Sequence, residues 1–160
     1  MFLDGMSFLE EEREAFRPFE RLLALSDEQL ARPIEAAHGW SGRDLMGHVL
    51  AWLVAALDVA RELAVSETSK RAAEIDADWA ARGGDVVNAE LLEEWRQKPM
   101  SELRDLFRTV PGELRGTLTV VPETRWLKNP SGMDTILDST LDHYEEHTAD
   151  LEAILAAAAS

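Results

Sequence analysis

Hydrophobic residues recur at three- and four-residue steps along most of this chain, and each such run predicts a helix with one apolar face. The first run begins at Ser7, where a capping-box pattern starts, and extends to about Leu25; Pro18 is expected to kink it or to begin its regular part. The second run, over 42–65, is the longest and follows a capping pattern formed by Ser41 and Asp44. The residues between them, 32–40, predict a loop.

The second half of the chain predicts two more long helices. One starts at Leu91, is interrupted by Pro99 and continues to about Leu118, and the other covers 132–157. The polar stretch 66–87 is interpreted as a connection that contains one short helix at most. Because no segment has a convincing strand pattern, the sequence predicts an all-α four-helix bundle with a long crossover between helices two and three.

Histidines stand out on two of these helices. His143 and His147 are four residues apart in the last one, a spacing that puts two imidazoles on one helix face about 6 Å apart along the axis. Both fall on a mostly apolar stripe. His48 lies between Leu45 and Trp52 on the apolar face of the second helix. All three are therefore predicted to point into the bundle.

Three converging imidazoles would form a metal site that keeps coordination positions open, the arrangement typical of metals used for chemistry. Such convergence requires helices two and four to be antiparallel. The positions of His48 and His147 would then differ in height by roughly 5 Å, against about 13 Å for parallel helices. The alternative interpretation is that the histidines are hydrogen-bonded core residues, and an isolated pair at this spacing is common by chance.

Other polar residues near these histidines are weaker candidates. His38 lies in a loop, where a structural or surface role is expected. Asp142, Glu145 and Glu146 flank the histidine pair and are expected to be solvated, although one of them could accept a hydrogen bond from a ligand imidazole. Tyr144 is expected to pack in the core more readily than to place its hydroxyl at the site.

Three tryptophans are candidates for enclosing a site. Trp52 follows His48 by one helical turn and would either form the wall of a pocket or pack in the core. Trp40 and Trp126 lie in predicted loops, where they would cover one end of the bundle or pack as ordinary core residues. Sequence motifs for zinc proteases, P-loops, dinucleotide-binding folds and nucleophile elbows are absent.

The composition of the chain disfavours several classes of partner and of chemistry. A chain of 160 residues, 46% of them hydrophobic, predicts one globular domain over 1–160. The net charge of −15 disfavours binding to nucleic acid or to an anionic membrane surface. There is no cysteine, so any thiol chemistry would need a thiol cosubstrate. Without a signal-peptide pattern or an apolar run of about 18 residues, a cytoplasmic location is expected.

The two histidine segments resemble those of a known superfamily. Residues 39–48, Gly-Trp-Ser-Gly-Arg-Asp-Leu-Met-Gly-His, and the closing His-Tyr-Glu-Glu-His of 143–147 are similar to the corresponding segments of DinB-like proteins, which include the N-terminal domain of mycothiol-dependent maleylpyruvate isomerase. The resemblance implies an up-down-down-up bundle and a divalent metal, often zinc or nickel, on His48, His143 and His147. It also implies use of a low-molecular-weight thiol by some members, and frequent homodimers.

The sequence thus supports two hypotheses. The first is a divalent-metal-dependent enzyme that acts on a small molecule, either as a thiol-dependent transferase or as a metal-assisted hydrolase. The second is a bundle without catalytic activity, in which the histidines are structural and the protein binds a small molecule or a partner protein.

Overall fold

The computed structural model describes residues 2–160, and all regular secondary structure in that range is helical. The elements are α1 (Gly5–Phe16), η1 (Arg17–Ala24), α2 (Asp27–Ala31), η2 (Glu35–Ala37), α3 (Gly42–Val65), α4 (Lys70–Arg82), α5 (Gly84–Arg96), α6 (Met100–Val120), η3 (Glu123–Arg125), α7 (Pro130–Ser139) and α8 (Leu141–Ala159). The all-α prediction is confirmed. None of the helices in residues 2–160 has the length and hydrophobicity that crossing a bilayer requires.

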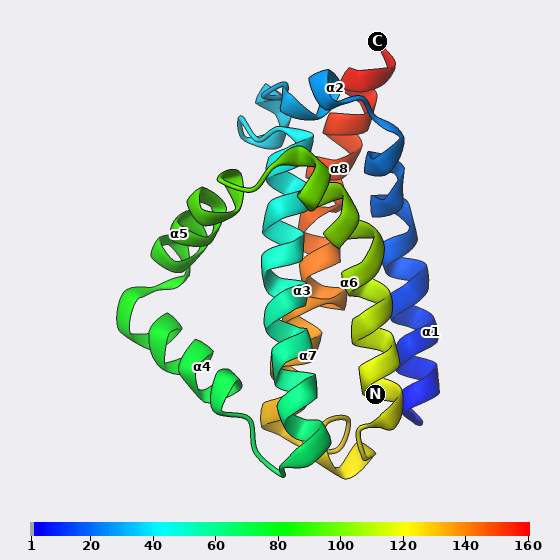
Figure 1. Ribbon diagram of the computed structural model, residues 1–160, viewed down its shortest axis with the longest axis vertical. Coiled ribbons are helices and arrows are strands. Elements are labelled where there is room, and N and C mark those ends of the chain that lie inside the picture. The colour runs from blue at the N-terminus through cyan, green and yellow to red at the C-terminus, as the bar shows by residue number, and fades with distance from the viewer. Residues whose placement is uncertain (1) are drawn as a thin grey trace.

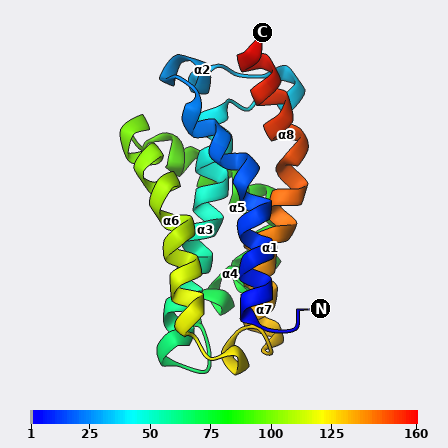
Figure 2. The same ribbon diagram turned by 90° about the vertical axis from the view of Figure 1, so that its right-hand side faces the viewer.

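The long segments lie side by side along the long axis of the molecule (Figures 1 and 2). In Figure 1, α1 and α8 run upward while α3 and α6 run downward, so α3 and α8 are antiparallel, as the histidine hypothesis required. Helix α3 contacts α6, α5, α7, α4 and α8, and is therefore the central helix. This position explains its composition, because 16 of its 24 residues are buried.

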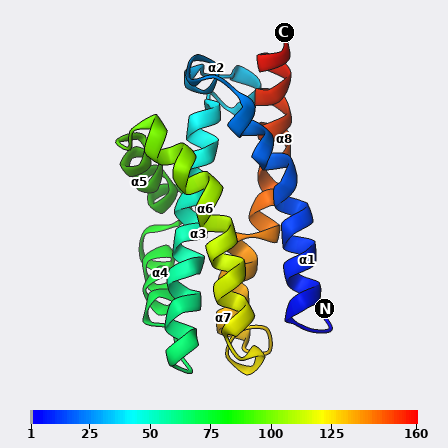
Figure 3. The same cartoon turned by 45° about the vertical axis from the view of Figure 1, so that its right-hand side comes forward.

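The stretch 66–87, expected to be a connection with one short helix at most, contains the 13-residue helix α4 and the first four residues of α5, which begins at Gly84 and not near Leu91. Ser69 caps α4 by accepting a hydrogen bond from the Ala72 amide at 3.0 Å. Gly83 ends α4 with a φ of +84°, a backbone conformation that residues other than glycine rarely adopt. Both helices are mostly exposed and pack on α3 from the side opposite α1 (Figure 3), so their polar sequences gave little helical periodicity.

The predicted helix 132–157 is divided at Thr140. The Thr140 hydroxyl donates a hydrogen bond to the Ile136 carbonyl at 2.6 Å, while its amide bonds to the Leu137 carbonyl at 3.2 Å. A buried hydroxyl bonded to a carbonyl one turn back is a known cause of helix distortion. The backbone of Thr140 (φ −121°, ψ −100°) leaves the helical region, and α8 begins only two residues before His143.

Two predicted helix starts were also wrong. Ser7 does not begin the first helix: Asp4 caps it, and Ser7 supplies the reciprocal bond of that capping box. Helix α7 begins after Asn129 with Pro130, two residues before the predicted start at 132. The capping box of Ser41 and Asp44 is confirmed, so the start of α3 at Gly42, six residues before His48, was predicted correctly.

A buried ion pair joins three helices of the bundle. Glu12 of α1, which is 1% exposed, accepts hydrogen bonds from the Arg115 guanidinium of α6 at 2.5 Å and from the Tyr144 hydroxyl of α8 at 2.8 Å. Burial and the Glu12 carboxylate both raise the pKa of Tyr144 well above its ordinary value. Tyr144 therefore packs in the core as a neutral donor to Glu12.

Replacing Glu12 by glutamine should destabilise the protein by about 3 kcal/mol, because Arg115 would lose its only buried counter-charge. The free energy of unfolding can be measured by urea denaturation with the slope checked for constancy. Glu11→Gln, an exposed neighbour on the same helix, should change it by no more than about 0.5 kcal/mol. Equal stability of the two variants would contradict a structural role for the ion pair.

Candidate metal centre

The rings of His48, His143 and His147 meet between α3 and α8. Their centroids are 4.7 Å apart for His48 and His143, 4.8 Å for His48 and His147, and 4.7 Å for His143 and His147. One ligand nitrogen from each ring lies within 4.8 Å of the other two. The predicted convergence of the three histidines is confirmed, and they are positioned to hold a metal ion.

Two of the three rings are buried and neutral. His48 is 3% exposed and His143 is 6% exposed, and their Nε2 atoms lie 2.8 Å apart. Burial, followed by the proximity of His147, lowers the pKa of His48 to about 4. Burial, followed by the proximity of His48 and His147, lowers the pKa of His143 to about 2. Neither ring is protonated at neutral pH, and neutral imidazole is the form that binds metals.

A purely structural role would leave ring nitrogens of His48 and His143 without hydrogen-bond partners. Within residues 2–160, the Nδ1 atoms of His48 and His143 have no hydrogen-bond partner, although both are buried. Unsatisfied buried polar atoms cost free energy, and native cores contain few of them. Imidazole nitrogens are also ligands that zinc and nickel accept readily. The residues therefore fit a divalent ion better than they fit a purely structural role.

Asp150 orients the third ring. Its Oδ2 lies 2.9 Å from Nδ1 of His147, and its Oδ1 lies 3.1 Å from Nδ1 of His38. A carboxylate on Nδ1 fixes the tautomer that leaves Nε2 with a free lone pair. The sequence pointed to Asp142, Glu145 or Glu146 as a possible hydrogen-bond acceptor for a ligand imidazole, whereas the structure has Asp150 in that role. Asp150 lies one helical turn beyond His147, so the same face argument could have found it.

Trp40 covers one side of the histidines. Its ring stacks on His147 with centroids 5.5 Å apart and 19° between planes, and it meets the edge of His48 at 4.9 Å. Backbone hydrogen bonds of 3.0 Å from Ile34 to Trp40 and from Gly39 to Ile34 close this loop tightly. Positive φ values at His38 and Gly39 make the turn possible. Trp40, expected to cover one end of the bundle or to pack as an ordinary core residue, instead lies against the candidate metal ligands.

The histidines form the floor of a cleft of about 850 Å³. Its walls come from α3, α4, α5, α7 and α8, and they include Trp40, Trp52 and Trp79. Trp52 therefore forms part of a pocket wall, one of the two roles predicted for it. Trp126, by contrast, is 1% exposed and donates its indole N–H to the Val121 carbonyl at 3.2 Å, so it is a core residue remote from this cleft.

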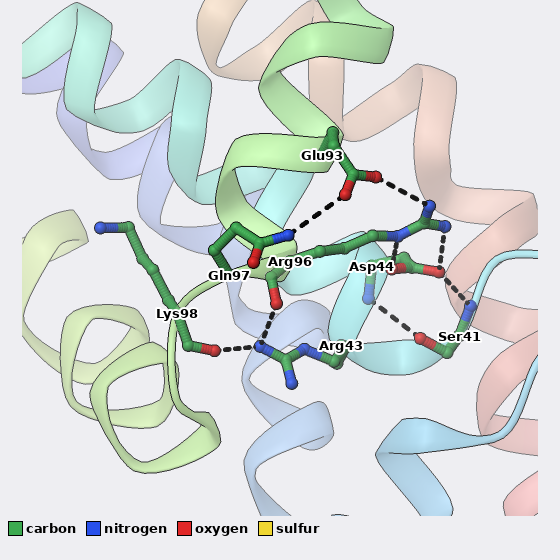
Figure 4. Close-up of polar contacts among 7 residues, drawn as sticks. All are labelled: Ser41, Arg43, Asp44, Glu93, Arg96, Gln97 and Lys98. Atoms are coloured by element: carbon green, nitrogen blue, oxygen red, sulfur yellow. Dashed lines mark hydrogen bonds and ion pairs between the residues drawn. The ribbon is translucent and has the colours of Figure 1, made fainter.

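A polar clamp holds α5 against the start of α3 (Figure 4). Asp44 accepts two bonds from the Arg96 guanidinium, at 2.9 and 3.1 Å, while Arg43 donates to the backbone carbonyls of Arg96 and Lys98. Burial raises the pKa of Asp44, but the hydrogen bond from Arg96 and the helix cap outweigh it and leave a net lowering. Asp44 thus both caps α3, as predicted, and fixes one wall of the cleft.

Comparison with known proteins agrees with this geometry. Residues 10–158 match the family described as the mycothiol maleylpyruvate isomerase N-terminal domain. The chain belongs to that family. The family is part of the DinB-like superfamily, so the resemblance seen in the two histidine segments is confirmed. No curated protein and no solved structure matches the chain in the other two comparisons.

The low pKa values of the buried rings predict how acid affects the metal-free protein. Unfolding returns His48 to a pKa near 6.5, so between about pH 6.5 and pH 4 the unfolded chain binds more protons than the folded one. The free energy of unfolding should therefore fall as the pH is lowered through this window. His48→Gln should give a shallower slope when urea unfolding is repeated at each pH; an unchanged slope would contradict the assignment.

Proposed function

We propose that this protein is a divalent-metal-dependent enzyme of the DinB-like superfamily, with His48, His143 and His147 as the metal ligands. The observation that carries the proposal is the convergence of three imidazoles at the floor of a cleft large enough for a small molecule. Three protein ligands, with no carboxylate among them, leave coordination positions for a substrate. The proposed frame is the up-down-down-up four-helix bundle of α1, α3, α6 and α7–α8.

The protein's own residues would each have a defined task. His48 and His143 contribute neutral nitrogens because burial keeps protons off them, and His147 contributes Nε2 because Asp150 holds the proton on Nδ1. Trp40, packed on His147, shields the site from water on that side. When bound, a divalent ion would lower the pKa of a water or thiol ligand at neutral pH.

Thiol transfer is our first choice of reaction, and metal-assisted hydrolysis is the second. The family name refers to an isomerase that depends on a thiol, which supports the first choice. Because this chain has no cysteine, the thiol would be a low-molecular-weight cosubstrate. The competing proposal, a small-molecule-binding protein without turnover, draws its support from the same cleft and would be favoured if metal is retained but neither reaction occurs.

Metal content tests the ligand assignment. Protein purified without a histidine tag and loaded with zinc or nickel should retain about one ion per chain after dialysis, measured by elemental analysis. His143→Ala should lose it, since two imidazoles bind much more weakly than three. His38→Ala is the matched control and should keep the ion, because His38 is bonded to Asp150 and is not one of the three converging imidazoles. Failure of the unsubstituted protein to hold zinc, nickel, manganese or iron would refute the proposal.

Asp150 provides a test of orientation without removing a ligand. Asp150→Asn should weaken zinc affinity by about tenfold or more, because the amide accepts a weaker hydrogen bond from His147. The affinity is measured by competition with a chromophoric chelator. Glu145→Gln, an exposed acid of the same helix, should leave the affinity unchanged. A weakening that is equal in both variants would indicate a general charge effect instead of an oriented imidazole.

A further inference from the structure

The cleft above the histidines is strongly acidic. Five carboxylates line it: Asp76 of α4, Asp85 of α5, Asp138 of α7, and Asp142 and Glu146 of α8. No lysine or arginine is among its lining residues. Low-dielectric walls lined by one sign of charge concentrate ions of the opposite sign. The cleft therefore attracts cations and repels anions.

These carboxylates are not neutralised by the protein. Among residues 2–160, none of the five forms an ion pair. Arg82, which follows Trp79 by three residues, is instead held by Asp78 at 2.6 Å and Glu90 at 2.7 Å. Burial raises the pKa of Asp138. The charges of its acidic neighbours raise it further, and Asp142 contributes most among them. The cleft thus carries negative charge that a ligand could compensate.

Aromatic rings form a corner beside this charge. Trp52 of α3 and Trp79 of α4 meet edge to face, with centroids 5.8 Å apart and 70° between planes. The Trp52 indole N–H donates to Asn88 of α5 at 2.9 Å, which fixes its orientation. Trp79 lies against Gly84, where a Cβ would come within 2.4 Å of its ring, yet it stays 45% exposed. The protein thus keeps a large aromatic face accessible.

The acids do not form a second metal site. Within the described residues, the three histidines are the only group of metal-ligating side chains close enough to share one ion. The carboxylates are spread over four helices around the opening, so they suit an extended organic cation better than a bare ion. A quaternary or alkylated ammonium group combines positive charge with apolar surface, and aromatic faces recognise it by cation–π attraction.

We propose that the substrate of this cleft is a cationic amine, with its ammonium group held between the Trp52–Trp79 corner and the carboxylates of α7 and α8. The inference rests on the proposed function for the reaction, but the binding preference can be measured on its own. His48 and His143, each more than nine-tenths buried, form the cleft floor, so a ligand placed this way lies against the candidate metal centre. A dicarboxylate such as maleylpyruvate would be repelled.

The test compares three probes that differ in charge. Choline and 3,3-dimethylbutan-1-ol have the same shape but differ in the charged nitrogen, and maleate is a dianion. Each is titrated into metal-free and zinc-loaded protein while the indole N–H resonances are followed by NMR. Choline should bind about tenfold more tightly than the alcohol, shifting Trp52 and Trp79 while leaving the buried Trp126 unaffected. Maleate should not bind.

Variants locate the binding. Glu146→Gln should weaken choline binding by about threefold or more, whereas Glu145→Gln, its neighbour outside this cleft, should not change it. Trp79→Ala, at a position that is 45% exposed, should weaken it by about fivefold. Equal affinity for choline and the alcohol, tighter binding of maleate, or no choline binding at all would each overturn the inference.

The two proposals fail in different ways. The unsubstituted protein should bind choline in both its metal-free and its zinc-loaded forms, because the carboxylates and tryptophans are in place without the ion. Failure of the unsubstituted protein to retain metal, with choline selectivity intact, would refute the metal assignment alone. Retained metal without choline selectivity would refute the cationic substrate alone.

Discussion

The antiparallel contact of α3 with α8 is the constraint on which the rest of this structure depends. It brings three imidazoles from two helices together, with ring centroids 4.7 to 4.8 Å apart, beside a largely apolar core. Burying them keeps His48 and His143 neutral, and it leaves their Nδ1 atoms without a partner in residues 2–160. A core selected for packing alone would avoid that cost, so the arrangement is best explained by ligand binding.

The surroundings of the histidines are built to hold one geometry. Asp150 ties α8 to the η2 loop by bonding both His147 and His38, and the same loop delivers Trp40 onto the imidazoles. Tyr144, the residue after His143, is fixed by Glu12, which in turn pairs with Arg115. The helix that carries two of the three histidines is therefore restrained at two adjacent positions on its circumference, which limits its rotation and keeps the rings converged.

The cleft has a separate origin from the histidines. Helices α4 and α5 pack on α3 away from α1. Acidic residues of α4 and α5 and of α7 and α8 line the cleft. Arg96 of α5 is bonded to Asp44, which lies one helical turn before His48 on α3. One wall of the cleft and the candidate metal centre are therefore fixed to the same part of α3. In the two proposals, the histidines would hold the metal that reacts, and the cleft walls would select the molecule that reaches it.

Helical periodicity, the Ser41–Asp44 cap and the inward face of His48, His143 and His147 could all be predicted from the sequence, because each depends on residues within a few turns of one another. The full length of α4 and the first half of α5 could not, since their polar surfaces carry too little apolar pattern to distinguish a helix from a loop. The break at Thr140 was also missed, because it arises from a hydroxyl bond whose geometry local propensity does not encode.

Local patterns therefore determined the class of fold and three histidines facing inward. Only the tertiary structure decided that these rings meet, because their distance depends on the direction and height of two helices whose histidines, His48 and His143, are 95 residues apart in the chain. The same holds for Asp150 beside His38 and for the tryptophan corner between α3 and α4. Those contacts join side chains that are far apart in the chain, and packing alone brings them together.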